Sequence, residues 1–392
     1  MWDKGHALPR RTAFALQDGE GVPTSCTGTA ADVAAPGLRF GEDVRTTFEY
    51  FRGALGVTLL GLVAAFVLGL VQGGHFDDGI SFLVVCLALT VLEISLSFDN
   101  AVVNANTLQG MSLLWQRRFL TWGIVVAVFG MRLLFPLLIV AIAADLGPLD
   151  ALHMAMFHPD RYAEVISHAH LQIAAFGGTF LMMVALHYFI DEAKDVDWIA
   201  RIECKLRACA AAQGLEVAFV LVVILGFAAM LPADKVDGYM MAAIAGLLSY
   251  SLVRGVGRML DGGGGARRAL AVGGLGAFLY LELLDASFSF DGVVGAFAMT
   301  DNLFLIAIGL GIGAVYVRSM TVMLVEKGTL SQFRYLEHGA FYSIMVLSFI
   351  MFVETQIEVS EMATGAVGVV LIAAALWSSV RHNRRLAEKE RA

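Results

Sequence analysis

Charged residues are scarce in this sequence. Asp, Glu, Lys and Arg make up only 16% of the 392 residues, whereas apolar types make up 58% and the mean hydropathy is +0.72. Soluble globular domains are usually about 45–50% apolar and about 25% charged, so this composition indicates an integral membrane protein. The formal net charge is −8, and no basic stripe with interleaved aromatic residues occurs. Nucleic-acid binding is therefore not expected.

Cysteine and nucleotide-binding motifs are also sparse. The four cysteines, Cys26, Cys86, Cys204 and Cys209, show neither a CxxC motif nor zinc-ligand spacing. This pattern predicts unpaired thiols and no structural metal site. No GxxxxGK[ST] motif occurs, so the chain has no P-loop with which to use ATP. No obligatory cofactor is expected, and any transport would be coupled to protons or to the membrane potential.

The first fifty residues lack apolar runs and helical periodicity. Arg10 and Arg11 resemble the start of a twin-arginine signal, but no apolar segment follows them. We therefore predict that residues 1–50 are a disordered cytoplasmic extension.

Ten apolar stretches follow, each near the roughly 20 residues that a helix needs to cross a bilayer. The expected fold class is therefore all-α, a polytopic transmembrane helix bundle of about ten spans. The predicted spans are 54–72, 80–108, 119–144, 171–190, 215–232, 239–257, 270–298, 302–325, 339–354 and 362–379.

Arginine and lysine are concentrated in alternate connections between these spans. By the positive-inside rule, this alternation places the basic connections and both termini in the cytoplasm. The predicted organisation is a first transmembrane half over 51–257, a Gly-rich cytoplasmic linker over 258–268, a second transmembrane half over 269–380 and a cytoplasmic tail over 381–392. The basic residues are Arg117 and Arg118, then Lys194, Arg201, Lys205 and Arg207, then Arg254, Arg258, Arg267 and Arg268, and those of the tail.

A short phrase occurs twice, once in each half. Residues 92–100 read LEISLSFDN and residues 283–291 read LLDASFSFD. The two copies lie in the second and seventh predicted spans, with four spans between them, so the two helices run in opposite directions across the membrane. We therefore predict an inverted internal repeat, a common plan among secondary transporters.

Both copies place carboxylates inside apolar spans. Each ionised carboxylate at the bilayer centre costs about 2.5–3.5 kcal/mol on insertion scales, and such residues are functional by default. Two arginines cannot neutralise all of these acids, so either some of the carboxylates are protonated or a cation completes the site, and a divalent cation would fit the charge difference. The acids are Glu93, Asp99, Asp285 and Asp291, with Glu282 as a further candidate, and the arginines are Arg132 and Arg318.

The spacing of the polar residues adds detail to this hypothesis. Glu93, Ser97, Asn100 and Asn104 share one helix face, whereas Asp99 points about 120° away. We predict a local break at each Ser-Phe-Asp, which would bring the acids together and free backbone carbonyls as ligands. The predicted metal ligands are Glu93, Asp99, Asn100, Asp285 and Asp291, with secondary partners Ser97, Asn104, Arg132, Glu282, Ser289 and Arg318.

The residue types narrow the choice of ion. Carboxylate, amide, hydroxyl and carbonyl oxygens suit Mn²⁺, Ca²⁺ or Mg²⁺, while zinc and copper sites use His, Cys and Met. The alternative to a cation site is a structural role, in which these polar side chains form hydrogen bonds between helices or pair with the two arginines. Gly309, Gly311 and Gly313 imitate a nucleotide loop but lie inside a predicted span, where we expect them to allow close helix packing.

Several motifs in order are similar to those of one family. LEISLSFDNAVV, FGMRLLFPL, LLDASFSFDGVVGAFAMTD, YVRSMT and YLEHGA resemble the TerC/Alx family, especially its uncharacterised TerC-like branch, over residues 48–380. The resemblance implies metal handling in the bacterial inner membrane, manganese export and an association with tellurium-resistance genes. It also implies that Asp99-Asn100, Asp285 and Asp291 match the acidic motifs of the family. Where TerC proteins usually read Asp-Ser-(Ile/Val)-Pro, this chain reads Asp291-Gly292-Val293-Val294.

Two functions remain open at this stage. The first is a secondary transporter that exports Mn²⁺ or a similar hard divalent ion. The second is a membrane scaffold that binds metal without transporting it and recruits stress-response or secretion partners, or a second copy of itself. An intramembrane aspartyl protease is disfavoured because the Gly-x-Gly-Asp phrase of those enzymes is absent before Asp291, so we expect no enzyme activity.

Overall fold

A computed structural model describes residues 43–392 apart from positions 145, 192–193, 195, 209–213, 262–265, 298, 358 and 392. Some helical side chains are also outside the description, including those at 256–273 and 290–291. The described residues all belong to the unit Ala35–Ala392. Most of the predicted N-terminal extension therefore lies outside the described residues.

The described residues form helices and contain no strand, which confirms the all-α prediction. Helix α1 begins at Asp43, so the last residues assigned to the disordered extension are helical instead. The helices are α1 Asp43–Gly73, α2 Phe76–Leu96, α3 Phe98–Gly110, α4 Leu113–Val125, the π-helix η1 Val126–Leu134, α5 Phe135–Ala143, α6 Pro148–Phe157, α7 Pro159–Ile190, α8 Ala200–Ala208, α9 Leu215–Ala228, α10 Ala233–Asp261, α11 Ala266–Phe297, α12 Leu303–Glu326, α13 Thr329–Gln332, α14 Leu336–Glu354 and α15 Glu361–Arg391.

Among the described residues, eight helical segments are long and apolar enough to cross a membrane. The chain is therefore a multi-pass membrane protein with a polytopic helix bundle. Each of the ten predicted stretches falls on a helix or a run of consecutive helices, but α9 and α11 are not among the eight. The 14 residues of α9 extend only about 21 Å, less than the hydrocarbon thickness. Helix α11 carries three acidic residues between positions 282 and 291.

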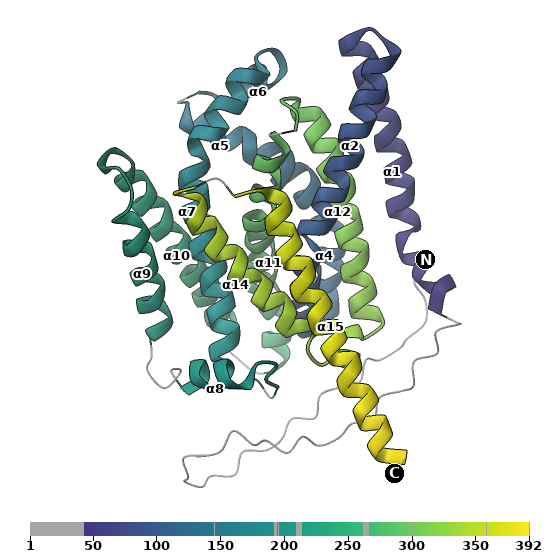
Figure 1. Cartoon of the computed structure of the whole chain (residues 1–392), viewed down its shortest axis with the longest axis vertical. Coiled ribbons are helices and arrows are strands. Elements are labelled where there is room, and N and C mark those ends of the chain that lie inside the picture. The colour runs from purple at the N-terminus through teal and green to yellow at the C-terminus, as the bar shows by residue number, and fades with distance from the viewer. Residues whose placement is uncertain are drawn as a thin grey trace. The chain divides into compact units, whose positions relative to one another are not determined.

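The helix ends gather at two ends of the bundle. At one end the Asn302 amide donates to Gln72 Oε1 (2.6 Å), which joins the α1–α2 turn to the start of α12. At the other end Lys327 Nζ donates to Thr47 Oγ1 (2.9 Å), which joins the start of α1 to the end of α12. Helix α6 lies at the first end, while α8 and the end of α15 lie at the second (Figure 1).

The two helices that carry the repeated phrase run in opposite directions. Helix α2 starts at the α6 end, and α11 finishes there, where Phe297 packs against Tyr162 near the start of α7. This antiparallel relation confirms the opposite orientation predicted for the two copies.

The predicted break at Ser-Phe-Asp occurs in only one copy. Helix α2 ends at Leu96 and α3 begins at Phe98, with Ser97 at φ −105° between them. Its amide still bonds to the Glu93 carbonyl (3.0 Å) and its own carbonyl accepts from the Ala101 amide (3.1 Å), so both backbone groups of Ser97 remain hydrogen-bonded at the break. Helix α11 continues unbroken through 289–291, so the prediction was wrong for the second copy. No proline follows Asp291 to interrupt it.

Helix α7 is the most buried of the candidate spans. In its most apolar stretch 72% of the residues are buried, against 17% for α1 at the periphery. A Cβ on Gly178 would stand 3.3 Å from the Ser348 carbonyl of α14, and one on Gly246 of α10 only 2.4 Å from the Phe176 carbonyl. Small residues therefore let α10 and α14 pack directly on the α7 backbone.

The glycines of α12 have the packing role predicted for them. A Cβ on Gly309 would stand 2.7 Å from the Leu89 Cβ, and one on Gly313 would stand 2.4 Å from the Glu93 Cγ. Thr90 Oγ1 also donates to the Gly309 carbonyl (3.1 Å). Helix α12 thus lies close against α2, with Gly313 next to the Glu93 side chain.

One sequence-based prediction was wrong, and two helix ends add detail to the predicted organisation. Cys204 is disulfide-bonded, so the prediction of unpaired thiols was wrong for that residue, while Cys86 is free and buried. Helix α10 extends to Asp261, so the linker begins later than predicted. Helix α15 continues to Arg391, so the predicted tail is helical. Cys26, Cys209 and the glycines 262–265 lie outside the described residues.

Candidate functional site

Glu93 and Arg132 form an ion pair inside the bundle. Arg132 Nη2 donates to Glu93 Oε1, and the two side chains are only 3% and 2% exposed. Ser97 Oγ donates to the same carboxylate oxygen (3.0 Å). Both charges of this pair are therefore compensated by near neighbours, as buried charges usually are.

A π-helix positions Arg132 for this contact. The segment Val126–Leu134 forms i→i+5 turns between α4 and α5, and Arg132 lies in its last turn. The wider turn changes the direction in which the following side chains point, and such insertions are frequent at functional sites. Nothing in the sequence pattern of this span indicates the π-helix.

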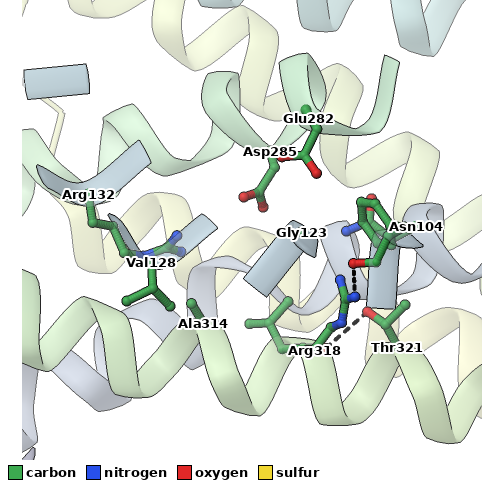
Figure 2. Close-up of a pocket in the computed structure, with 11 residues that line it drawn as sticks. Asn104, Gly123, Val128, Arg132, Glu282, Asp285, Ala314, Arg318 and Thr321 are labelled. Carbon is green, nitrogen blue, oxygen red and sulfur yellow. Dashed lines mark hydrogen bonds between the residues drawn. The ribbon is translucent and has the colours of Figure 1, made fainter. Parts of the chain in front are cut away.

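A second group of charged residues surrounds a small cavity between α3, α4, η1, α11 and α12. Figure 2 shows Glu282 and Asp285 of α11 directed toward this space, with Arg318 and Thr321 of α12 on the facing wall. We name it the α11–α12 cavity, and it has room for about two water molecules. Its lining residues are Asn104, Phe119, Gly123, Val128, Arg132, Glu282, Asp285, Ala314, Val317, Arg318 and Thr321.

Three oxygen atoms of the residues that line this cavity are buried without a hydrogen-bond partner in the protein. They are Glu282 Oε1, Asp285 Oδ2 and Asn104 Oδ1. Buried polar atoms are normally hydrogen-bonded, so an unpartnered set around one cavity requires an explanation such as water or an ion. The oxygen-only donor set would suit a hard cation.

Arg318 lies at the wall of the same cavity but bonds to neither acid. Its Nη2 donates to the Phe119 carbonyl of α4, and its guanidinium lies 4.5 Å from the centre of the Phe119 ring. The Arg318 Nε is buried without a partner. Glu282 and Asp285 interact electrostatically with this guanidinium across the cavity.

Asp99 lies in a different place. It accepts hydrogen bonds from Ser343 Oγ (2.7 Å) and from the amide of Asn100 (2.8 Å). It borders a second small cavity, which we name the α14–α15 cavity because most of its wall comes from those helices. The lining residues are Ser95, Leu96, Asp99, Phe288, Ser343, Val346, Leu347, Ile350, Thr364, Gly365, Val367 and Gly368.

Asn100 links the two acidic positions. Its backbone amide donates to Asp99 Oδ1, and its side-chain amide donates to Asp285 Oδ1 (2.7 Å). The predicted ligands therefore do not converge on one point: Glu93 is paired with Arg132, Asp99 borders one cavity and Asp285 the other.

The remaining predicted residues fall into three groups. Ser97 and Asn104 lie where described above. Ser289 is buried with its hydroxyl unpartnered. The Asp291 side chain lies outside the described residues. Among the side chains that the structure describes, no group of three or more His, Cys, Asp or Glu residues could hold a metal ion. A cation at the α11–α12 cavity would therefore use two carboxylates together with amide and water oxygens.

Several functional contacts were not predicted from the sequence. Ser343 and Thr321 are hydroxyl residues in apolar spans, and Phe119 contributes a backbone carbonyl that leaves no trace in sequence. Gly123 also lines the cavity. A Cβ at this position would stand 3.2 Å from both Arg318 Nη1 and Glu282 Oε1. The hydroxyl residues Ser343 and Thr321 inside apolar spans are signals that a sequence search could have used.

Another buried carboxylate lies at the α8 end of the bundle, outside the candidate spans. Glu203 accepts from Lys194 Nζ, from the amides of Trp198 (3.1 Å) and Ile199 (2.9 Å), and from the Tyr342 hydroxyl (3.1 Å). Burial alone would raise the pKa of Glu203, but the bonds from Lys194 and Ile199 outweigh it and leave the pKa below its ordinary value.

Sequence comparison assigns the chain to a family. The model of a family described as "Protein of unknown function (DUF475)" matches residues 98–386. The chain belongs to this family. No curated protein and no solved structure matches it. The matched part of the DUF475 chain includes every residue that lines the α11–α12 cavity and all but Ser95 and Leu96 of the α14–α15 cavity, while Glu93 lies before it.

Proposed function

We propose that this DUF475 protein is a secondary transporter that exports a hard divalent cation, with Mn²⁺ the best-fitting ion and Ca²⁺ or Mg²⁺ as alternatives. The observation that carries the proposal is the α11–α12 cavity, where oxygens of Glu282, Asp285 and Asn104 are buried without protein partners. No catalytic role is assigned to these residues, and we propose that the protein is not an enzyme.

Charge is the first argument for a cation. Arg132 is engaged by Glu93, which leaves Glu282 and Asp285 opposite a single arginine that bonds elsewhere. Two uncompensated carboxylates in a helix bundle would be costly at membrane depth. A divalent cation between them would compensate both charges.

Ligand chemistry is the second argument. Small hard cations keep several water ligands and often use only one or two carboxylates from the protein. A cavity with room for about two waters, two carboxylates and one amide oxygen fits such a partly hydrated ion. Zinc and copper are disfavoured because no His, Cys or Met lines this cavity.

The resemblance to the TerC/Alx family supports the same proposal. Its manganese handling would agree with the oxygen ligands, and its inner-membrane location with the multi-pass fold. The basic residues of α8 and of α15 lie at the same end of the bundle, which we propose faces the cytoplasm together with both termini (Figure 1).

The test is metal flux in reconstituted vesicles. We expect wild-type protein to move Mn²⁺ and expect Glu282→Gln and Asp285→Asn each to lower the flux by at least about tenfold, because each removes a ligand charge. Asp301→Asn is the matched control, since it removes an exposed carboxylate at the start of α12 and should leave flux unchanged.

The competing function is a metal-binding scaffold in the response to tellurium or metal stress. It would bind Mn²⁺ at the same cavity without moving it across the membrane. Mn²⁺ binding by the purified wild type, together with no flux of Mn²⁺, Ca²⁺ or Mg²⁺ with or without a pH gradient, would reject transport in favour of the scaffold.

A further inference from the structure

The Arg318 side chain is weakly held for a buried arginine. The described structure gives its guanidinium one hydrogen bond, to the Phe119 carbonyl, and a face-on contact with the Phe119 ring. Its Nε has no partner. A neutral carbonyl is a weaker partner for a guanidinium than a carboxylate, which can accept two parallel bonds. The side chain therefore has a stronger partner available if a carboxylate comes within reach.

Glu282 is such a partner, and Gly123, which has no side chain of its own, lies beside both groups. Arg318 Nη1 and Glu282 Oε1 each lie 3.2 Å from the point where a Cβ on Gly123 would stand. They face each other across the glycine, and Glu282 Oε1 has no hydrogen-bond partner. A rotation of the Arg318 side chain would join them without moving a helix.

We propose that Arg318 is a tethered counter-cation of the α11–α12 cavity. It pairs with Glu282 and Asp285 when the cavity holds no metal, and it stays on the Phe119 carbonyl when metal is bound. This inference rests on the proposed transport function. It identifies Arg318 as the residue that allows the transporter to change conformation when no ion is bound.

The reason lies in the charge of the empty site. A transporter with alternating access must change conformation both loaded and empty. Loaded, the two carboxylates are compensated by the divalent ion. When no ion is bound, the two carboxylates would stay buried with two negative charges during the same conformational change, at a cost of several kcal/mol. Two arginines line the cavity, and of these Arg132 is bound to Glu93 while Arg318 is bonded to a backbone carbonyl.

Two modes of transport separate this role from a structural one. Exchange of Mn²⁺ for labelled Mn²⁺ needs only the loaded carrier, whereas net efflux needs the empty carrier to return. For Arg318→Gln we expect exchange close to the wild-type rate but net efflux at least about tenfold slower, because the empty site loses its counter-charge. Mn²⁺ binding should tighten by about tenfold, since a competing cation has been removed.

Two further variants and a control complete the design. Arg318→Lys keeps the charge but loses the planar contact with Phe119, so we expect it to restore most of the net efflux. Gly123→Ala keeps every charge but places a methyl group between Arg318 and Glu282, so we expect it to slow net efflux more than exchange. Arg161→Gln removes an exposed arginine at the start of α7 and should change neither mode.

The outcomes test the role of Arg318 separately from the proposed transport function. An equal loss of exchange and net efflux in Arg318→Gln, with no rescue by Arg318→Lys, would show that Arg318 only anchors α12 to α4 and would overturn the inference while wild-type transport stands. A wild type that neither binds nor exchanges Mn²⁺, Ca²⁺ or Mg²⁺ would instead overturn the proposed function.

Discussion

The two halves of the bundle use the same residue types to different ends. In the first half Glu93 is bonded to Arg132 and to Ser97. In the second half Glu282 and Asp285 face Arg318, but that arginine is bonded to the Phe119 carbonyl instead. A buried acid with its arginine in place is part of the fold, whereas buried acids without one form a site that an ion can complete. The comparison therefore separates one compensated carboxylate from two carboxylates that we propose bind an ion.

Helix geometry explains the difference. The π-helix η1 lies in the span that carries Arg132 and directs that side chain to Glu93. Helix α12, which carries Arg318, is regular throughout, and its Arg318 meets α4 before it meets α11.

The largest effect on stability should follow from breaking the compensated pair. We expect Arg132→Leu to lower the free energy of unfolding by about 3–5 kcal/mol, because Glu93 would keep a buried charge without its partner. Thermal unfolding of the purified protein in detergent would measure it. Replacing both residues, as in Glu93→Gln with Arg132→Leu, should cost less than Arg132→Leu alone. If Glu282→Gln destabilised the protein as much as Arg132→Leu, the proposed difference between the carboxylates of the two halves would be wrong.

Glu203 offers a further carboxylate for the comparison, because it lies in α8, outside the candidate spans, and has a full set of partners. We expect Glu203→Gln to cost about 2–3 kcal/mol at neutral pH through loss of charge-assisted bonds. The folded-state pKa of Glu203 lies below its ordinary value of 4.5. Its stabilisation is therefore present above that value and is lost as the pH falls through the lower folded-state pKa.

Unfolding measured from neutral pH down into the acid range would check this expectation. The difference in stability between wild type and Glu203→Gln should shrink only below about pH 4.5. A difference that stayed constant with pH would mean that the carboxylate charge is not what stabilises the α8 end.

Two glycines provide a graded test of packing on the acids. A Cβ on Gly313 would stand 2.4 Å from the Glu93 Cγ, whereas one on Gly123 would stand 3.2 Å from Glu282 Oε1. We expect Gly313→Ala to destabilise the protein by about 1–3 kcal/mol through overpacking, and Gly123→Ala by less. Thermal unfolding of the two variants side by side measures the difference. The reverse order would show that the second site is the more tightly packed one.

The smallest effect should come from the hydroxyl that supports Asp99. We expect Ser343→Ala to cost about 1–2 kcal/mol, because it removes one hydrogen bond to a buried carboxylate. Ser81→Ala is a matched control, since that hydroxyl is exposed and bonds only to a carbonyl of its own helix. Equal effects of the two variants would mean that Asp99 does not depend on Ser343.

Much of the fold could be predicted because it follows from local patterns. Runs of apolar residues place the helices, and the repeated phrase indicates that α2 and α11 are related and antiparallel. The break at Ser97 occurs as predicted, but its counterpart in α11 does not, although the two phrases are nearly identical. The same short phrase is therefore compatible with both an interrupted and a continuous helix, and it does not by itself decide helix continuity.

The sequence by itself determined that this protein is a helical membrane bundle with more acids than arginines inside it. Burial in an apolar medium requires hydrogen-bonded helices, and acidic residues there are costly wherever they occur. Only the tertiary structure decided which acid would receive an arginine. Glu93 meets Arg132 through a π-helical turn, while Arg318 meets a backbone carbonyl and leaves Glu282 and Asp285 facing a cavity. Such pairings depend on the rotation and approach of whole helices, which no local pattern in the chain encodes.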